Sequence, residues 1–145
     1  MDISVINLGG LASEALKQAF VNRLNMALFS WIKQHPSPTG RLYALDEAQN
    51  YAPSQIKTAC SQSTNSLVAQ ARKYGLGMIF ATQHPKGIDN AIVSNATTHF
   101  YGRVSAPATI QAIQEMASAR GAAPMTSRGS TRENFTSRPR VLCAQ

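Results

Sequence analysis

The sequence predicts an α/β protein in which helices flank a largely parallel sheet. Short apolar runs alternate with longer segments that carry apolar residues every three or four positions, as strands and amphipathic helices do. Two of the short runs end in polar side chains, an arrangement typical of parallel sheets with a site at the carboxyl ends of their strands. The chain has 145 residues, of which 43% are hydrophobic, and this is the size and apolar content of one domain.

The amino-terminal third predicts a strand, a long helix and a second strand. Residues 3–8 are rich in β-branched side chains and predict a buried strand. Ser13 predicts an N-cap for a helix that continues to about Gln34 and is stopped by Pro36. The next strand is expected at 42–45. The helical spacing predicts a single core-facing stripe, formed by Leu16, Phe20, Leu24, Leu28 and Trp31 or Ile32.

The rest of the chain continues the alternation. The polar segment 55–64 predicts a loop or a short helix. The elements expected after it are a helix at 65–73, a strand at 78–81, a connector with room for a helical turn at 86–94, a strand at 97–104 and a helix at 108–117. A short last strand is expected at 141–142. Residues 1–117 therefore predict the folded domain, and residues 118–145 a basic, poorly ordered tail.

The charge of the chain is positive and uneven. The formal net charge is +7, and the segment 118–145 contributes five arginines against one glutamate. Such a tail either contacts nucleic-acid phosphates or is a solvated basic end, and the scarcity of aromatic residues there favours the second interpretation. The sequence shows no secretory leader, no apolar run long enough to span a membrane and no cysteine pattern for a metal. We therefore expect a cytoplasmic protein that does not bind membranes.

Two adjacent carboxylates, Asp46 and Glu47, follow the strand expected at 42–45. Such an Asp can support a hydrated Mg²⁺, and the Glu beside it can orient a water that attacks a phosphate. This is the Walker B pattern of nucleotide hydrolases, although apolar strands also end in acids that are merely solvated. Gln83 follows the strand at 78–81, with one helix between the two strands, so Glu47 and Gln83 are expected to face the same pocket.

The sequence resembles the HerA/FtsK group of P-loop ATPases in three blocks that come in the order and spacing of that family. The blocks are LDEAQNY at 45–51, AQARKYGLG at 69–77 and FATQHPKG at 80–87, and residues 95–98 and 102–103 continue the similarity. The resemblance implies a partial RecA-like core that binds ATP and Mg²⁺. It also implies assembly into a homo-oligomeric ring, usually a hexamer, that acts on duplex DNA.

The resemblance implies specific roles for individual side chains. Asp46 would support Mg²⁺ through its water shell, Glu47 would be the catalytic carboxylate and Gln83 the polar sensor; all three would contact the bound Mg²⁺–ATP. Arg72 would be an arginine finger, often one that serves the neighbouring subunit of a ring, and Arg103 is a weaker candidate for that role. Arg72 can equally be an exposed residue that complements a helix end.

The sequence lacks one part that the family requires. It contains no G-x-x-x-x-G-K-[ST] loop, and the first expected strand corresponds to the strand that follows the P-loop in the family. We therefore expect this chain to be the carboxyl-terminal part of such an ATPase and to be inactive alone. Two alternatives remain: a non-catalytic remnant that binds nucleic acid or a ring partner through its basic tail, and a flavodoxin-like domain without a role in ATP chemistry.

Overall fold

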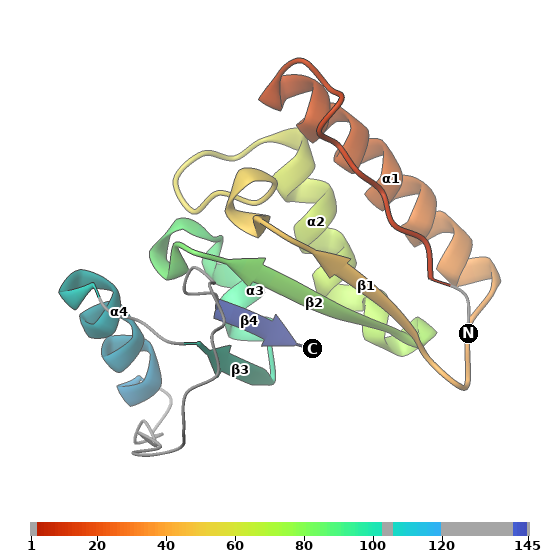
Figure 1. Cartoon of the computed structure of the whole chain (residues 1–145). Coiled ribbons are helices and arrows are strands. Elements are labelled where there is room, and N and C mark those ends of the chain that lie inside the picture. The colour runs from red at the N-terminus through yellow and green to blue at the C-terminus, as the bar shows by residue number, and fades with distance from the viewer. Residues whose placement is uncertain (1–2, 103–105, 120–140, 145) are drawn as a thin grey trace.

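The computed structural model describes residues 3–102 and 106–119, and the backbone of 141–144; four strands form one sheet in the order β1-β2-β4-β3 (Figure 1). The strands are β1 (Arg41–Leu45), β2 (Leu76–Thr82), β3 (Thr98–Tyr101) and β4 (Val141–Ala144). The α-helices are α1 (Glu14–Gln34), α2 (Ala59–Gln70), α3 (Asn90–Asn95) and α4 (Pro107–Ser118). Short 3-10 helices occupy Ala48–Asn50 (η1), Ala71–Tyr74 (η2) and Pro85–Gly87 (η3).

The fold class is α/β, as predicted, but the sheet is less parallel than predicted. β1 and β2 pair in parallel, because α2 returns the chain to the start of the sheet between them. β4 runs antiparallel to both of its neighbours, β2 and β3. β1, β2 and β3 therefore point in the same direction, and the expectation of a largely parallel sheet fails at the strand inserted between β2 and β3.

Residues 3–8 do not form the predicted strand. They run as an extended coil (Figure 1), and the side chains of Ile3 and Val5 are 80% and 86% exposed. The strand β1 is an edge strand of the sheet, and among the described strands it pairs only with β2. A β-branched run becomes a strand only where a neighbour supplies ladder hydrogen bonds, and none of the four described strands pairs with residues 3–8.

The long helix α1 begins where predicted, but its buried stripe is displaced. The Ser13 hydroxyl caps the helix by accepting the N–H of Leu16 over 3.3 Å. The fully buried residues of α1 are Val21, Asn25 and Ile32. Of the residues predicted to face the core, Ile32 is fully buried and Leu28 packs against the core, whereas Leu16 is 52%, Phe20 41% and Trp31 44% exposed. The prediction placed apolar side chains in the core and so missed the buried Asn25.

Asn25 is buried because it links three elements. Its Nδ2 donates to the Thr64 hydroxyl on α2 over 2.9 Å, and its Oδ1 accepts the Tyr43 hydroxyl of β1 over 3.1 Å. The Thr64 hydroxyl in turn donates to the carbonyl of Cys60 over 2.8 Å. A buried polar group is tolerated when its hydrogen bonds are satisfied, and this one then fixes how α1, α2 and β1 meet.

The burial of Tyr43 makes the free energy of unfolding depend on pH in the alkaline range. Burial raises the pKa of Tyr43 from 10.0 to about 12. Between these values the unfolded chain releases the phenolic proton while the folded chain keeps it, so stability falls as pH rises, by up to about 1.4 kcal/mol per pH unit. In urea unfolding across this pH window, Tyr43→Phe should remove that part of the slope. Equal slopes in the two proteins would contradict the assignment, since the other tyrosines are common to both.

The helix α2 begins earlier than predicted. Thr58 and Ser61 form a reciprocal capping box, in which each side chain accepts the backbone N–H of the other residue. The segment 55–64 therefore contains the first turns of the helix. The helix ends in η2, which closes at Gly75 in the left-handed conformation, as the glycine there predicted.

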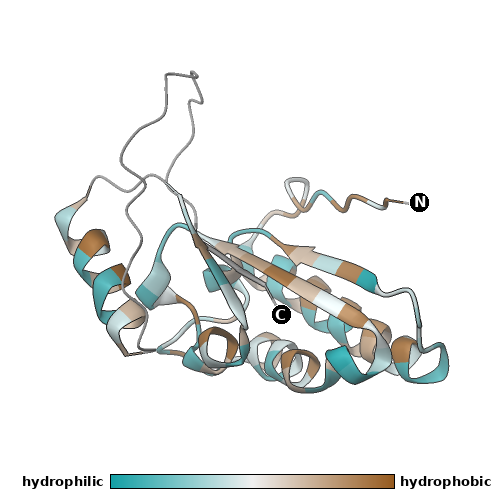
Figure 2. Ribbon diagram, turned by 90° about the horizontal axis from the view of Figure 1, so that it is seen from below, coloured by the Kyte–Doolittle hydropathy of each residue, from teal (hydrophilic) through white to brown (hydrophobic). Residues whose placement is uncertain are grey.

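The main core lies between the sheet and the helices on one of its faces. Leu76, Met78 and Phe80 alternate along β2 and are buried against α1 and α2, which lie together on that side of the sheet (Figure 2). Leu42 on β1 and Phe100 on β3 are 65% and 56% exposed. Within the described ranges, no helix is both long and apolar enough to cross a membrane.

The boundary predicted at 117–118 falls near the end of α4, which extends to Ser118. The predicted tail 118–145 lies mostly outside the described residues, as does Arg103. At the end of that segment, β4 at Val141–Ala144 includes the short strand predicted at 141–142.

Candidate functional site at the carboxyl ends of β1 and β2

The structure brings Glu47 and Gln83 together. β1 and β2 are parallel neighbours in which Leu45 lies opposite Phe80, so the residues that follow the two strands emerge at the same edge of the sheet. The Gln83 Nε2 donates to the Glu47 Oε1 over 2.6 Å. The predicted proximity of these two side chains is therefore confirmed, whereas their roles in ATP chemistry stay predictions.

A second amide holds the other oxygen of the same carboxylate. The Gln49 Nε2 donates to the Glu47 Oε2 over 2.6 Å. The Oε1 of Gln49 accepts the buried Thr82 hydroxyl over 2.6 Å, which fixes the orientation of the amide. Thr82 is itself held by the N–H of His84 over 3.0 Å. Both carboxylate oxygens of Glu47 thus accept hydrogen bonds from amide side chains.

The backbone at Glu47 adopts a conformation that few side chains take. Its φ is 52° and its ψ 43°, the only positive φ at a non-glycine residue in the described part of the chain. This left-handed residue lies between β1 and η1. It turns the chain so that the Gln49 amide reaches the Glu47 carboxylate. A left-handed non-glycine residue costs about 1–2 kcal/mol, and such strain often accompanies functional side chains.

Asp46 stands beside this network at the end of β1. Its side chain is exposed, and its Oδ1 accepts the backbone N–H of Glu47 over 3.0 Å. Carboxylate oxygens suit Mg²⁺, which keeps several of its own waters and needs only one or two protein carboxylates. The described residues contain no group of three or more His, Cys, Asp or Glu that could hold a metal. The magnesium role of Asp46 stays a prediction.

The two loops that follow β1 and β2 are not glycine-rich. β1 is followed by Asp46 and η1, and β2 by Gln83 and η3. A cradle requires several backbone N–H groups at a glycine-rich turn leading into a helix. The loops after β1 and β2 thus present carboxylate and amide groups rather than a glycine-rich turn.

Arg72 does not join this site within one chain. It is exposed in η2, immediately before β2, whereas Gln83 follows β2. The seven residues of β2, at about 3.3 Å each, put roughly 20 Å between the two ends of the strand. Arg72 therefore cannot reach Glu47 within one chain, and its role as an arginine finger stays a prediction.

The sequence interpretation assigned no role to Gln49 or Thr82. A signal was present, because Gln49 follows Glu47 by two residues and Thr82 immediately precedes Gln83. Their link depends on the left-handed turn at Glu47, which a pattern of residue types does not reveal.

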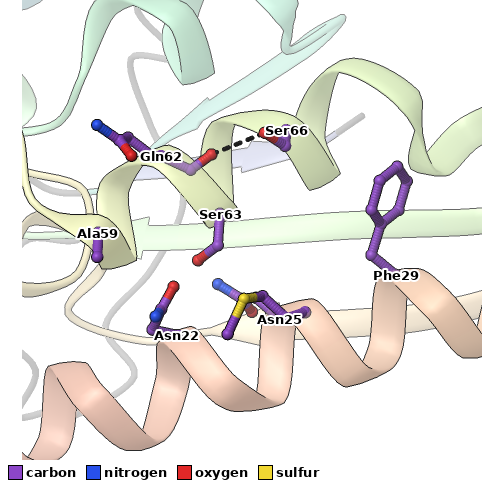
Figure 3. Close-up of a pocket in the computed structure, with 8 residues that line it drawn as sticks. Asn22, Asn25, Phe29, Ala59, Gln62, Ser63 and Ser66 are labelled. Atoms are coloured by element: carbon purple, nitrogen blue, oxygen red, sulfur yellow. Dashed lines mark hydrogen bonds between the residues drawn. The ribbon is translucent and has the colours of Figure 1, made fainter.

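A separate hollow of about 340 Å³ lies between α1 and α2 (Figure 3). The hydroxyl of Ser66 on its wall is already bonded to the carbonyl of Gln62 over 2.9 Å. The walls combine amide and hydroxyl groups with two larger apolar side chains and lack a charged residue. The lining residues are Asn22, Asn25, Met26, Phe29, Ala59, Gln62, Ser63 and Ser66.

Neither a scan against protein-family models nor a search of curated proteins finds a match to this sequence.

Proposed function

We propose that this chain supplies the Walker B and sensor part of a HerA/FtsK-like ATPase with a RecA-like core. The observation that supports the proposal most directly is the carboxylate of Glu47, held by Gln83 and Gln49 at the shared edge of two parallel strands. A polar residue on the neighbouring strand that touches the catalytic carboxylate can link nucleotide state to the orientation of that carboxylate.

The residues divide the chemistry between them. Bound ATP with Mg²⁺ would supply the phosphoryl group and the charge that stabilises its transfer. Asp46 would hold water molecules of the magnesium shell, while Glu47 would orient the attacking water and accept its proton. Gln83 would keep Glu47 in place and release it when the phosphate contacts change. In the intact protein, we propose that this cycle drives a ring of subunits along duplex DNA.

The isolated chain is expected to hydrolyse ATP at no more than the background rate. The reason is the missing phosphate cradle, since the edge offers carboxylates and amides but no P-loop. A Mg²⁺-dependent phosphate-release assay measures this directly. Robust turnover that disappears in Glu47→Gln would contradict the prediction and would show that other residues cradle the phosphates.

The test of the proposed function is the reading frame upstream of the Met1 codon. We expect it to encode a strand followed by G-x-x-x-x-G-K-[ST], and the protein extended by that segment to hydrolyse ATP. An extended protein that binds no nucleotide would favour the alternative, a non-catalytic chain that binds nucleic acid or a ring partner.

A further inference from the structure

The two amides that hold the Glu47 carboxylate are anchored to different degrees. Gln49 donates to Oε2 of the carboxylate over 2.6 Å, and its own Oε1 accepts the Thr82 hydroxyl over 2.6 Å. Gln83 donates to Oε1 of Glu47 over 2.6 Å, and within the described part of the chain no further hydrogen bond fixes its side chain. Glu47 therefore has one support that is held at both ends and one that is held at a single end.

Hydrogen-bond chemistry fixes the direction of the anchored chain. An ionised carboxylate only accepts hydrogen bonds, so Gln49 must turn its NH₂ group toward Glu47 and its oxygen toward Thr82. The Thr82 hydroxyl, on a residue that is 1% exposed, then donates its single proton to Gln49 and accepts the N–H of His84 over 3.0 Å. A reversed Gln49 amide would set its oxygen against the carboxylate and leave Oε2 without a donor.

The backbone around Gln49 is also tied to its neighbours. Gln49 lies in η1, where the N–H of Asn50 donates to the carbonyl of Glu47 over 2.9 Å. The carbonyl of Asn50 accepts the side-chain amide of Gln18, on α1, over 2.7 Å. The helix η3 packs close as well, since a Cβ added to Gly87 would lie 3.6 Å from the Cβ of Gln49. Gln49 is therefore held in place when the side chain of Glu47 moves.

We propose that Gln49 and Thr82 are positioning residues, which keep Oε2 of Glu47 in place when Gln83 releases Oε1. The carboxylate then turns about its bond to Gln49 and presents Oε1 to a water, whereas a carboxylate held by Gln83 alone would swing free on release. This inference rests on the proposed function, because it assigns what holds the general base after Gln83 has let go. It adds a fixed oxygen and an exchangeable one to the same carboxylate.

The full chain without nucleotide is sufficient for the test, because the network is complete there. Solution NMR measures two quantities: the order of the Glu47 side chain, from ¹³C relaxation of its methylene groups, and the exchange of the Gln49 and Gln83 amide protons with water. We expect the Gln49 protons to exchange more slowly than those of Gln83, by about two- to tenfold, since the additional hydrogen bond to Thr82 holds that amide. Equal exchange of the two amides would contradict the difference in anchoring.

Removing one support at a time tests the asymmetry directly. Gln49→Met and Gln83→Met each replace an amide by an apolar side chain of similar length. Gln49→Met should lower the order parameter of the Glu47 side chain to below about 0.6, the flexible range, whereas Gln83→Met should leave it close to the value of the unaltered chain. Equal effects of the two substitutions, or a larger effect of Gln83→Met, would overturn the proposal.

The role of Thr82 is tested by a conservative pair of variants. Thr82→Ser keeps the hydroxyl and should keep Glu47 ordered, whereas Thr82→Val keeps the shape and should free Glu47 as Gln49→Met does. The matched control is Thr64→Val, which removes an equally buried hydroxyl from the network of Asn25 and should leave the Glu47 signals unchanged. Equal changes in the two valine variants would mean a general loss of stability and would overturn the role of Thr82. If Thr82→Val does not fold, as judged by circular dichroism, the comparison of Gln49→Met with Gln83→Met decides.

These outcomes are distinguishable from a failure of the proposed function. The NMR measurements need no nucleotide, so they can refute the positioning by Gln49 and Thr82 whatever the chain does with ATP. An extended protein that binds no nucleotide would refute the ATPase role and would leave the measured order of Glu47 unchanged.

Discussion

Glu47→Gln is expected to lower the rate of ATP hydrolysis by about 10²–10⁴-fold in the extended protein, if the proposed upstream P-loop segment is encoded. The substitution removes the base and keeps the shape of the side chain. The Gln49 amide is fixed by Thr82, whereas Gln83 can turn its amide to match the new side chain. The network should therefore re-form with one reversed amide, and the loss should appear in kcat rather than in stability.

The matched control is Glu115→Gln, which neutralises an exposed carboxylate of α4 that pairs with Lys86 over 2.8 Å. That pair lies on the surface and should affect neither stability nor turnover appreciably. Single-turnover measurements with saturating Mg²⁺–ATP separate the chemical step from binding. If Glu47→Gln retained full activity, the general base would be a different group and the proposed role of Glu47 would be wrong.

Gly75→Ala is expected to destabilise the fold by at least about 3 kcal/mol, a large part of the 5–15 kcal/mol typical of a domain. A Cβ on Gly75 would lie 2.0 Å from the carbonyl oxygen of Ser37, and the residue has a φ of +76°. Ser37 cannot move away freely, because its N–H is bonded to the carbonyl of Tyr74. The substitution therefore combines a backbone clash with a strained conformation.

Gly40→Ala separates these two effects. Gly40 also has a positive φ, +82°, but the nearest atom to its new Cβ would be 4.0 Å away. Only the conformational cost of about 1–2 kcal/mol should remain. Urea unfolding of the two variants measures the difference. Equal destabilisation would show that the close approach of Ser37 is relieved at little cost.

Local periodicity was sufficient to predict α1, β1 and β2, because these elements satisfy their own helical pattern or are buried by adjacent elements. It failed at residues 3–8, where a strand-like composition has no partner strand. It also failed at Asn25, whose burial depends on hydroxyls that come from Thr64 and Tyr43 elsewhere in the chain. Strand pairing and polar satisfaction are tertiary properties, and a residue pattern contains them only indirectly.

The candidate site, like the fold, could be predicted only in part from the sequence. The contact between Glu47 and Gln83 follows from two strands of equal direction joined by a helix. The support from Gln49 does not follow from it, because it depends on a left-handed backbone at Glu47 that helix and strand patterns do not encode. Arg72 lies at the opposite end of β2 from Gln83, and this is known only once the sheet is seen.

The position of β4 has a consequence for synthesis. β2 ends at Thr82 and β4 begins at Val141, yet β4 lies between β2 and β3. On the ribosome, which adds about 5–20 residues per second, the first three strands emerge several seconds before the strand that separates two of them. During that interval the facing edges of β2 and β3 lack their ladder partner and are open to strands of other nascent chains. The yield of folded protein should therefore depend on chain concentration and on chaperones during translation, even where the finished fold is stable.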